Sequence, residues 1–144
     1  MPNRVDFSSR YSRGRNDPPD LPGQPVIEIV LVNGKKHFAT FGLIESGSVW
    51  TIMGTKYADA LGLDYANAPR VEIIGLGNTR SVGYEVDLRL VLKAANYAWD
   101  SKITVSPAVD AFPFILLGHV GFFDHFDVTL QTRYRHFHII RPNT

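Results

Sequence analysis

Short runs in which hydrophobic and polar residues alternate dominate this chain, and a period of two is typical of half-buried β-strands. The clearest run is residues 86–92, where almost every second position is valine or leucine and Asp87 and Arg89 lie between them. The uninterrupted apolar run at 112–118 is typical of a strand buried on both faces. Together the patterns predict strands at 26–32, 35–44, twice within 70–92, and at 97–105, 112–118, 127–130 and 134–140.

Glycine, asparagine and charged residues separate these strands. Asn33-Gly34 between two β-rich runs predicts a hairpin with a type I′ turn, and the second strand of that hairpin leads directly into Glu45. A glycine-rich stretch from Gly75 to Gly83 predicts the tip of a second hairpin.

Two segments have helical spacing. Residues 52–62 predict a short helix, with Thr55 placed to cap its start and Gly62 placed to end it. Residues 119–126 predict one or two further helical turns. The apolar face of the first helix comprises Tyr57, Ala58 and Leu61.

Strands joined by tight turns therefore outnumber helices. The chain predicts an all-β domain, a small closed or orthogonally packed β-barrel with one or two short helices. A length of 144 residues favours one domain, which we place at residues 26–142. Residues 1–25 contain four arginines and end in "NDPPDLPGQP", and we expect them to form a flexible, basic and proline-rich arm.

Composition excludes several classes of protein. The chain has no cysteine, which rules out disulfides, thiolate metal sites and a cysteine nucleophile. A net charge of +1 gives no global attraction to nucleic acid, and the arginines of the arm are interpreted as a solvated tail. No apolar run approaches the roughly 20 residues of a membrane span, and the first 25 residues lack the apolar core of a signal peptide. We expect a cytoplasmic protein with no nucleic-acid or membrane partner.

Four kinds of site have little support. "GLGNTR" at 75–80 lacks the third glycine of a dinucleotide loop. A serine nucleophile at Ser46 or Ser48 lacks its G-x-S-x-G turn. The five histidines lack metal-ligand spacing, so no metal or cofactor is expected. A glycosidase-like pair of Glu45 with Asp87 or Asp124 has no support from spacing.

One constellation remains, in four parts along the chain. A strand ends in Glu45-Ser46-Gly47, a glycine-tipped hairpin follows, and a second apolar strand ends in glycine before a short helix. A carboxylate at a strand end has to be held by a tight turn, which Gly47 permits and the Ser46 hydroxyl can fix by hydrogen bonding. The second glycine turn can pack beneath that loop, and the hairpin can close over the acid. The supporting residues of this second turn are Leu116, Leu117 and Gly118.

This order resembles the retropepsin-like aspartic peptidases, the retroviral-type single-domain family. The resemblance rests on "VNGKKHFATFGLIESGSVWTI", on "IIGLGNTRSVGYEV" as the flap and on "FILLGHVGFFDHFDVTL", and it covers roughly residues 26–142. The last stretch is similar to bacterial or phage-borne members. The resemblance implies a barrel of the retropepsin type, a homodimer and an aspartic endopeptidase without a cofactor.

In that family the acid is aspartate, and two such acids activate a water that attacks a peptide carbonyl. This chain has a single acid-Ser-Gly, so the resemblance implies one carboxylate from each of two chains, with Glu45, Ser46 and Gly47 as the catalytic loop. Glutamate adds one methylene, which displaces the carboxylate by up to about 1.5 Å and predicts weakened or absent activity. The residues implied in peptide binding are Val49, Ile73, Ile74, Gly75, Leu76 and Gly77.

Two functions remain open at this point. The chain is either a peptidase slowed or silenced by Glu45, or a non-catalytic dimer of the same fold that binds extended peptides. A β-barrel in which Glu45 lies in an ordinary turn is the third interpretation. Replacing Glu45 by aspartate separates the first from the second, because only a peptidase gains activity from that change.

Overall fold

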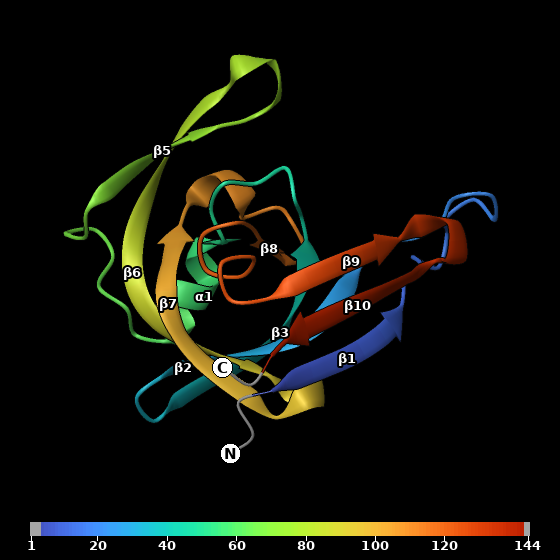
Figure 1. Cartoon of the computed structure of the whole chain (residues 1–144). Helices are drawn as coiled ribbons and strands as arrows, with labels where there is room; N and C mark the ends of the chain where they lie inside the picture. The colour runs from blue at the N-terminus through green and yellow to red at the C-terminus, as the bar shows by residue number, and fades with distance from the viewer. Residues whose placement is uncertain (1–3, 143–144) are drawn as a thin grey trace.

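The computed structural model describes residues 4–142, and its regular secondary structure is almost entirely β-strand (Figure 1). These residues contain one short α-helix and four single 3-10 turns. The strands are β1 Val5–Arg10, β2 Val26–Asn33, β3 Lys36–Ile44, β4 Ile52–Met53, β5 Arg70–Ile74, β6 Arg80–Leu92, β7 Tyr97–Val105, β8 Ile115–Leu117, β9 Asp127–Gln131 and β10 His136–Arg141, and the helix is α1 Thr55–Ala60.

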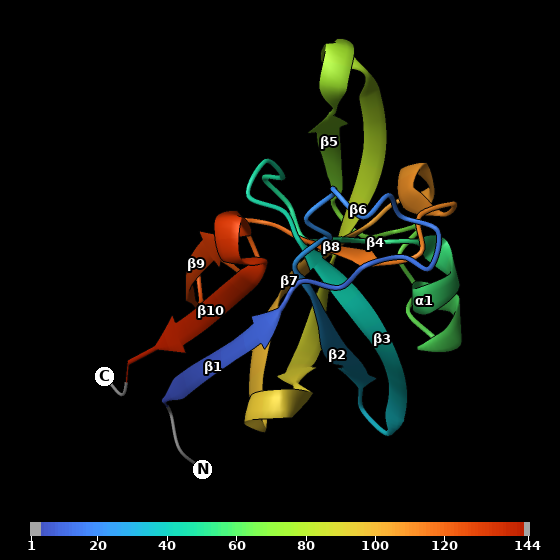
Figure 2. The ribbon, with the colours of Figure 1, turned by 90° about the vertical axis from the view of Figure 1, so that its right-hand side faces the viewer.

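The main sheet closes on itself into a barrel. Its order is β2-β3-β8-β4-β7-β6, and a further pairing of β6 with β2 completes the ring. β5 is bonded to the outer part of β6, so the β5–β6 hairpin rises away from the barrel (Figure 2). The predicted all-β fold with a closed barrel is confirmed.

The first hairpin forms with its turn displaced by one residue from the prediction. Asn33 pairs with Lys36, so the two-residue loop is Gly34–Lys35 instead of Asn33–Gly34. The φ of Gly34 is +60°, while Lys35 is not among the residues with positive φ. A positive φ at the first loop position only is the pattern of a type II′ turn, so the type I′ prediction was wrong.

Helix α1 is shorter than predicted, because Ile52 and Met53 pair as strand β4 before it starts. Gly54 is the residue before the first turn, and Thr55 is the first helical residue and not the cap. The predicted end is confirmed: Gly62 has a φ of +66°, and its N–H and that of the next residue bond to carbonyls of the last turn. The predicted apolar face of Tyr57, Ala58 and Leu61 is buried.

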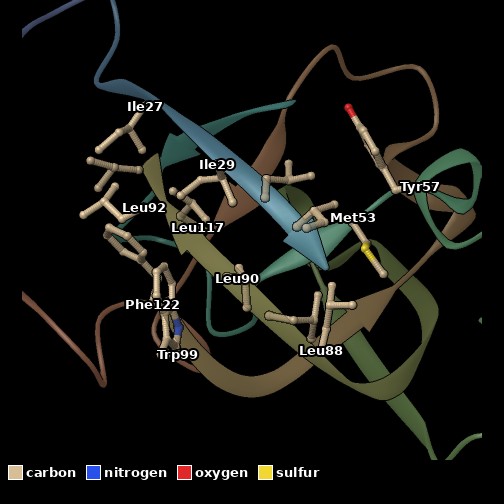
Figure 3. Packing of buried hydrophobic residues seen from close by; sticks show 14 of the residues in the cluster. Ile27, Ile29, Met53, Tyr57, Leu88, Leu90, Leu92, Trp99, Leu117 and Phe122 are labelled. Carbon is tan, nitrogen blue, oxygen red and sulfur yellow. The ribbon is translucent and has the colours of Figure 1, made fainter. Parts of the chain in front are cut away.

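The barrel interior is filled by alternate residues of the long strands, as the alternation predicted (Figure 3). Leu88, Leu90 and Leu92 of β6 are at most 4% exposed. Trp99 of β7 lies among Phe122 and Phe126, and its indole N–H donates to the carbonyl of Gly121 at 2.9 Å. The buried indole therefore joins the barrel to the segment that follows β8.

Residues 119–126 form turns and a β-bridge from Val120 to Trp50 but no helix, so that prediction was wrong. The φ of Gly121 is +105°, which interrupts any right-handed helix at this point. The N–H groups of Phe123 and Asp124 bond five residues back, to Gly118 and His119. The apolar residues that suggested a helix, Phe122 and Phe126, are instead buried in the barrel core.

The first 25 residues are not wholly an arm. Val5–Arg10 forms β1, which pairs along its length with β10, and Val5 is 1% exposed. An antiparallel β-bridge between Ser12 and Gln24 also joins the two ends of the proline-rich segment. Folded structure therefore begins well before Val26, because Val5 and Phe7 supply an apolar face that the surrounding polar residues obscured.

β1, β10 and β9 form a second, three-stranded sheet beside the barrel. Phe137 and Ile139 of β10 are fully buried on one face of it. Both edges of β10 are occupied, by β1 and by β9 of the same chain. Within residues 4–142, no helix has the length and apolar character needed to cross a bilayer.

Candidate active site

Glu45 follows β3 directly, at the point where a buried strand reaches the surface. β3 runs parallel to β8, with Ile44 beside Leu117, and the N–H of Glu45 donates to the Leu117 carbonyl at 3.0 Å. Leu43 and Ile44 are 7% and 3% exposed. The packed strand thus fixes where the backbone of Glu45 lies and leaves its side chain at the barrel rim.

The chain turns sharply after Glu45. The N–H of Ser48 donates to the Glu45 carbonyl at 3.1 Å, and the N–H of Gly47 donates to Glu45 Oε1 at 3.1 Å. The acid is therefore bonded to its own loop. Gly47 does not have a positive φ, but a Cβ there would lie 3.1 Å from Glu45 Oε1, so glycine leaves room for the carboxylate.

Ser46 takes part through its backbone carbonyl. This oxygen lies 2.7 Å from Nε2 of His119, a residue of the segment after β8. The predicted role of the Ser46 hydroxyl has no support among the hydrogen bonds of residues 4–142. Ser48 uses its hydroxyl instead, which donates to the Trp50 carbonyl at 2.6 Å.

Gly118 packs directly against this loop. A Cβ on Gly118 would lie 2.2 Å from the Trp50 carbonyl oxygen and 2.6 Å from that of Ser48, so no other residue fits. The Gly118 N–H donates to Thr51 Oγ1 at 3.1 Å, and the His119 N–H donates to the Ser48 carbonyl at 2.9 Å. Gly118 thus lies against the end of the acid loop, the name used below for residues 45–49.

The β5–β6 hairpin, which is the segment predicted as a flap and is given that name below, lies across a cleft from the loop. Its tip is Gly75–Thr79, closed by bonds from the Gly75 N–H to the Thr79 carbonyl at 2.8 Å and from Thr79 Oγ1 to the Leu76 carbonyl at 2.7 Å. The predicted tip extended to Gly83, which was wrong: Gly83 pairs with Val71 inside the hairpin. A Cβ on Gly83 would lie 2.3 Å from the side chain of Thr104, so this glycine serves close packing.

A cleft of about 620 Å³ lies between the acid loop and the flap. Of the residues predicted from the sequence, it is lined by Glu45, Gly47, Val49, Ile73, Ile74, Gly75, Leu76 and Leu116. Ser46, Gly77, Leu117 and Gly118 do not line it: Leu117 is in the core, and Gly77 is at the outer end of the flap with a φ of +69°.

The cleft has further residues that the sequence did not reveal. Trp50 and Val109 line it, and so does Glu72 of β5, the second acid in the cleft. Arg80, across the hairpin, forms an ion pair with Glu72, and both side chains are more than half exposed. Trp50 comes soon enough after Glu45 in the sequence for a position in the cleft to be inferred, whereas Val109 is brought to the cleft only by the tertiary fold.

No histidine lines the cleft, although His119 contacts the loop that carries Glu45. His138 lies 2.6 Å from Asp6, and the hydrogen bond from His138 holds the pKa of that carboxyl below its ordinary value. His125 is beside Asp124, and burial lowers its pKa. In the described part of the chain, no three His, Asp or Glu side chains are grouped closely enough to bind a metal.

Comparison with known proteins by sequence found no matching family model and no matching curated protein. The solved structures found by comparison of the structure include two aspartic proteases. One is a retropepsin-like aspartic protease from Rickettsia conorii, with a TM-score of 0.65, 12% identity, and coverage of 93% of this chain and 98% of that chain. The other is EIAV protease complexed with the inhibitor HBY-793, with a TM-score of 0.50, 14% identity, and coverage of 69% and 86%. The chain therefore has a retropepsin-like fold.

Proposed function

We propose that this protein is an aspartic endopeptidase of the retropepsin type, in which Glu45 takes the place of the usual aspartate and two chains form one site. The observation that carries the proposal is the position of Glu45. Its carboxylate accepts the N–H of Gly47, two residues on, at the floor of a cleft beneath a hairpin. The retropepsin-like fold supports the same interpretation.

The reaction needs two carboxylates close together. One acts as a base toward a water molecule, and the other, still protonated, donates to the peptide carbonyl, because two close carboxylates do not both ionise. Within one chain, the other acid of the cleft is Glu72, which lies on the flap and is paired with Arg80. We therefore assign the second carboxylate to the Glu45 of another copy, related to the first by a two-fold axis.

Glutamate changes the geometry of such a pair. Its extra methylene moves each carboxylate by up to about 1.5 Å, and a misplacement of about 1 Å can cost roughly a hundredfold in rate. The hydrogen bond to Gly47 draws the longer side chain back onto its own loop, which offsets part of this displacement. We expect slow or absent cleavage by the Glu45 form and faster cleavage after Glu45→Asp.

The substrate is an extended peptide with apolar side chains. Ile73, Ile74 and Leu76 of the flap and Val49 of the loop surround the cleft. β5 is paired with β6 on one side, and its other edge is free in residues 4–142. A peptide added to that edge gains backbone hydrogen bonds and places alternate side chains in the cleft.

The second candidate is a dimer of the same fold that holds peptides without cleaving them. The substitution of glutamate for the family's aspartate favours it, since binding needs the cleft but not a reactive carboxylate pair. Both proposals use the same cleft and flap, so they differ only in whether the bound peptide is cleaved.

The test is cleavage of a mixed peptide library between about pH 4 and pH 7 by three forms: the unchanged chain, Glu45→Asp and Glu45→Gln. Cleavage by the Asp form with none by the Gln form supports the peptidase, and cleavage by the unchanged chain shows that glutamate serves as the acid. If no form cuts but the unchanged chain retains peptides, the binding dimer is the better assignment. The Gln form is the matched control, because it keeps the side-chain volume and removes only the acid.

A further inference from the structure

We propose that His119 is a positioning residue that sets the direction of the Glu45 carboxylate through the peptide group between Ser46 and Gly47. The activity part of this inference rests on the function proposed above, and the structural part does not. His119 was not among the residues predicted for the site.

The argument begins with one planar group. The carbonyl of Ser46 and the N–H of Gly47 belong to the same peptide, and in a trans peptide they point in opposite directions. The carbonyl oxygen lies 2.7 Å from His119 Nε2, and the N–H donates to Glu45 Oε1 at 3.1 Å. A hydrogen bond from His119 at one edge of this planar group therefore fixes where the N–H points at the opposite edge.

This peptide needs an external hold. Gly47 has no Cβ, so rotation of the peptide is sterically easy, and both Ser46 and Gly47 are exposed to competing water. The backbone bonds of the loop fix its two ends, at the N–H of Glu45 and the N–H of Ser48. The contact from His119 to the Ser46 carbonyl fixes the peptide group between these two ends.

The imidazole is itself held in place. The backbone of His119 is fixed at both ends: its N–H donates to the Ser48 carbonyl at 2.9 Å, and its carbonyl accepts the N–H of Asp124 at 3.0 Å. The ring stacks on Phe123, with centroids 5.1 Å apart and planes 28° apart. A bond to a carbonyl requires a proton on Nε2, so the neutral ring has Nε2 as donor.

The first test reads the Gly47 amide directly, by ¹H–¹⁵N NMR of the full chain. Glu45→Ala defines the position of the Gly47 amide proton without the carboxylate. His119→Phe keeps the stacking and removes the donor, so it should move the Gly47 signal toward the Glu45→Ala position. His119→Gln, whose amide N–H can reach the same carbonyl, should leave it near that of the unchanged chain.

A Gly47 signal that Glu45→Ala shifts but His119→Phe leaves unchanged overturns the proposal, and so does one that Glu45→Ala fails to shift. The indole N–H of Trp99, bonded to the Gly121 carbonyl, is the control for folding and should keep its position in every variant.

The second test uses whichever form of the chain cuts peptides. There His119→Phe should lower kcat by roughly 10- to 100-fold with little change in KM, and His119→Gln should restore most of it. An unchanged kcat in His119→Phe contradicts a positioning role. If no form cuts, the proposed function fails, and the NMR result alone decides the role of His119.

Discussion

Gly118 is the position where the structure leaves least room, and its replacement by alanine tests the packing beneath the acid loop. The new Cβ would lie 2.2 Å from the Trp50 carbonyl oxygen and 2.6 Å from that of Ser48. Real Cβ atoms essentially never come closer than 3.0 Å, so the two backbone segments must separate by at least about 0.8 Å. Neither neighbour is the end of a flexible side chain, so the backbone itself has to move.

We expect Gly118→Ala to lower the free energy of unfolding by about 1–3 kcal/mol, the usual cost of overpacking a close contact. For a chain of this length that corresponds to a fall in melting temperature of roughly 3–12 °C. Urea unfolding followed by tryptophan fluorescence measures the free energy. The same displacement carries Glu45 with it, so any cleavage activity should fall as well.

Gly75→Ala is the matched control. Gly75 has a φ of −101° and a ψ of −170°, which alanine adopts readily, and its new Cβ would meet nothing closer than 3.9 Å. The free energy of unfolding of this variant should stay within about 0.5 kcal/mol of the unchanged chain. A Gly118→Ala chain as stable as Gly75→Ala would refute the packing argument.

Three further predictions follow from other parts of the structure. Burial lowers the pKa of His125 below 6.5, with Arg141 adding to the effect and Asp124 opposing it, so the unfolded chain binds more protons and stability falls as the pH drops from 7.5 to 5.5. Urea midpoints at the two values should show this difference, and His125→Asn should reduce it. Trp99→Phe leaves the buried Gly121 carbonyl without its indole donor, which should cost about 1–3 kcal/mol in thermal unfolding. Leu76→Ser, at a position 97% exposed, should leave unfolding unchanged but weaken peptide binding in a fluorescence titration.

The sequence predicted those features of the fold that depend on local pattern. The alternation in residues 86–92 identified the inner face of β6, because side chains on a strand point to opposite faces in turn. Gly62 ended the helix where expected, since a glycine readily takes the left-handed conformation. The three motifs of the acid loop, the flap and the Gly118 turn do meet in space, as their order along the chain indicated.

Features that depend on distant neighbours were missed. β1 exists because β10 offers a partner and the barrel covers Val5, and neither is visible within residues 1–25. The turns after Gly118 have helical spacing of apolar residues, yet Gly121 interrupts a helix there. His119 contacts the carbonyl of Ser46, which lies 73 residues earlier in the chain, and no rule based on residue spacing predicts such a contact.

The proposed pairing of two Glu45 carboxylates determines which side of the chain the second copy contacts. β10 is paired on both sides within its own chain, so this strand offers no open edge to a partner, whereas β1 and β9 are the edge strands of their sheet. The apolar side chains that remain exposed include Val49 of the acid loop, at 59%, and Leu76 of the flap, at 97%. Only contact on this side brings two Glu45 loops together. In the proposed dimer, the contact that covers Val49 and Leu76 also pairs the two Glu45 carboxylates, so we expect dissociation of the dimer to abolish any cleavage activity.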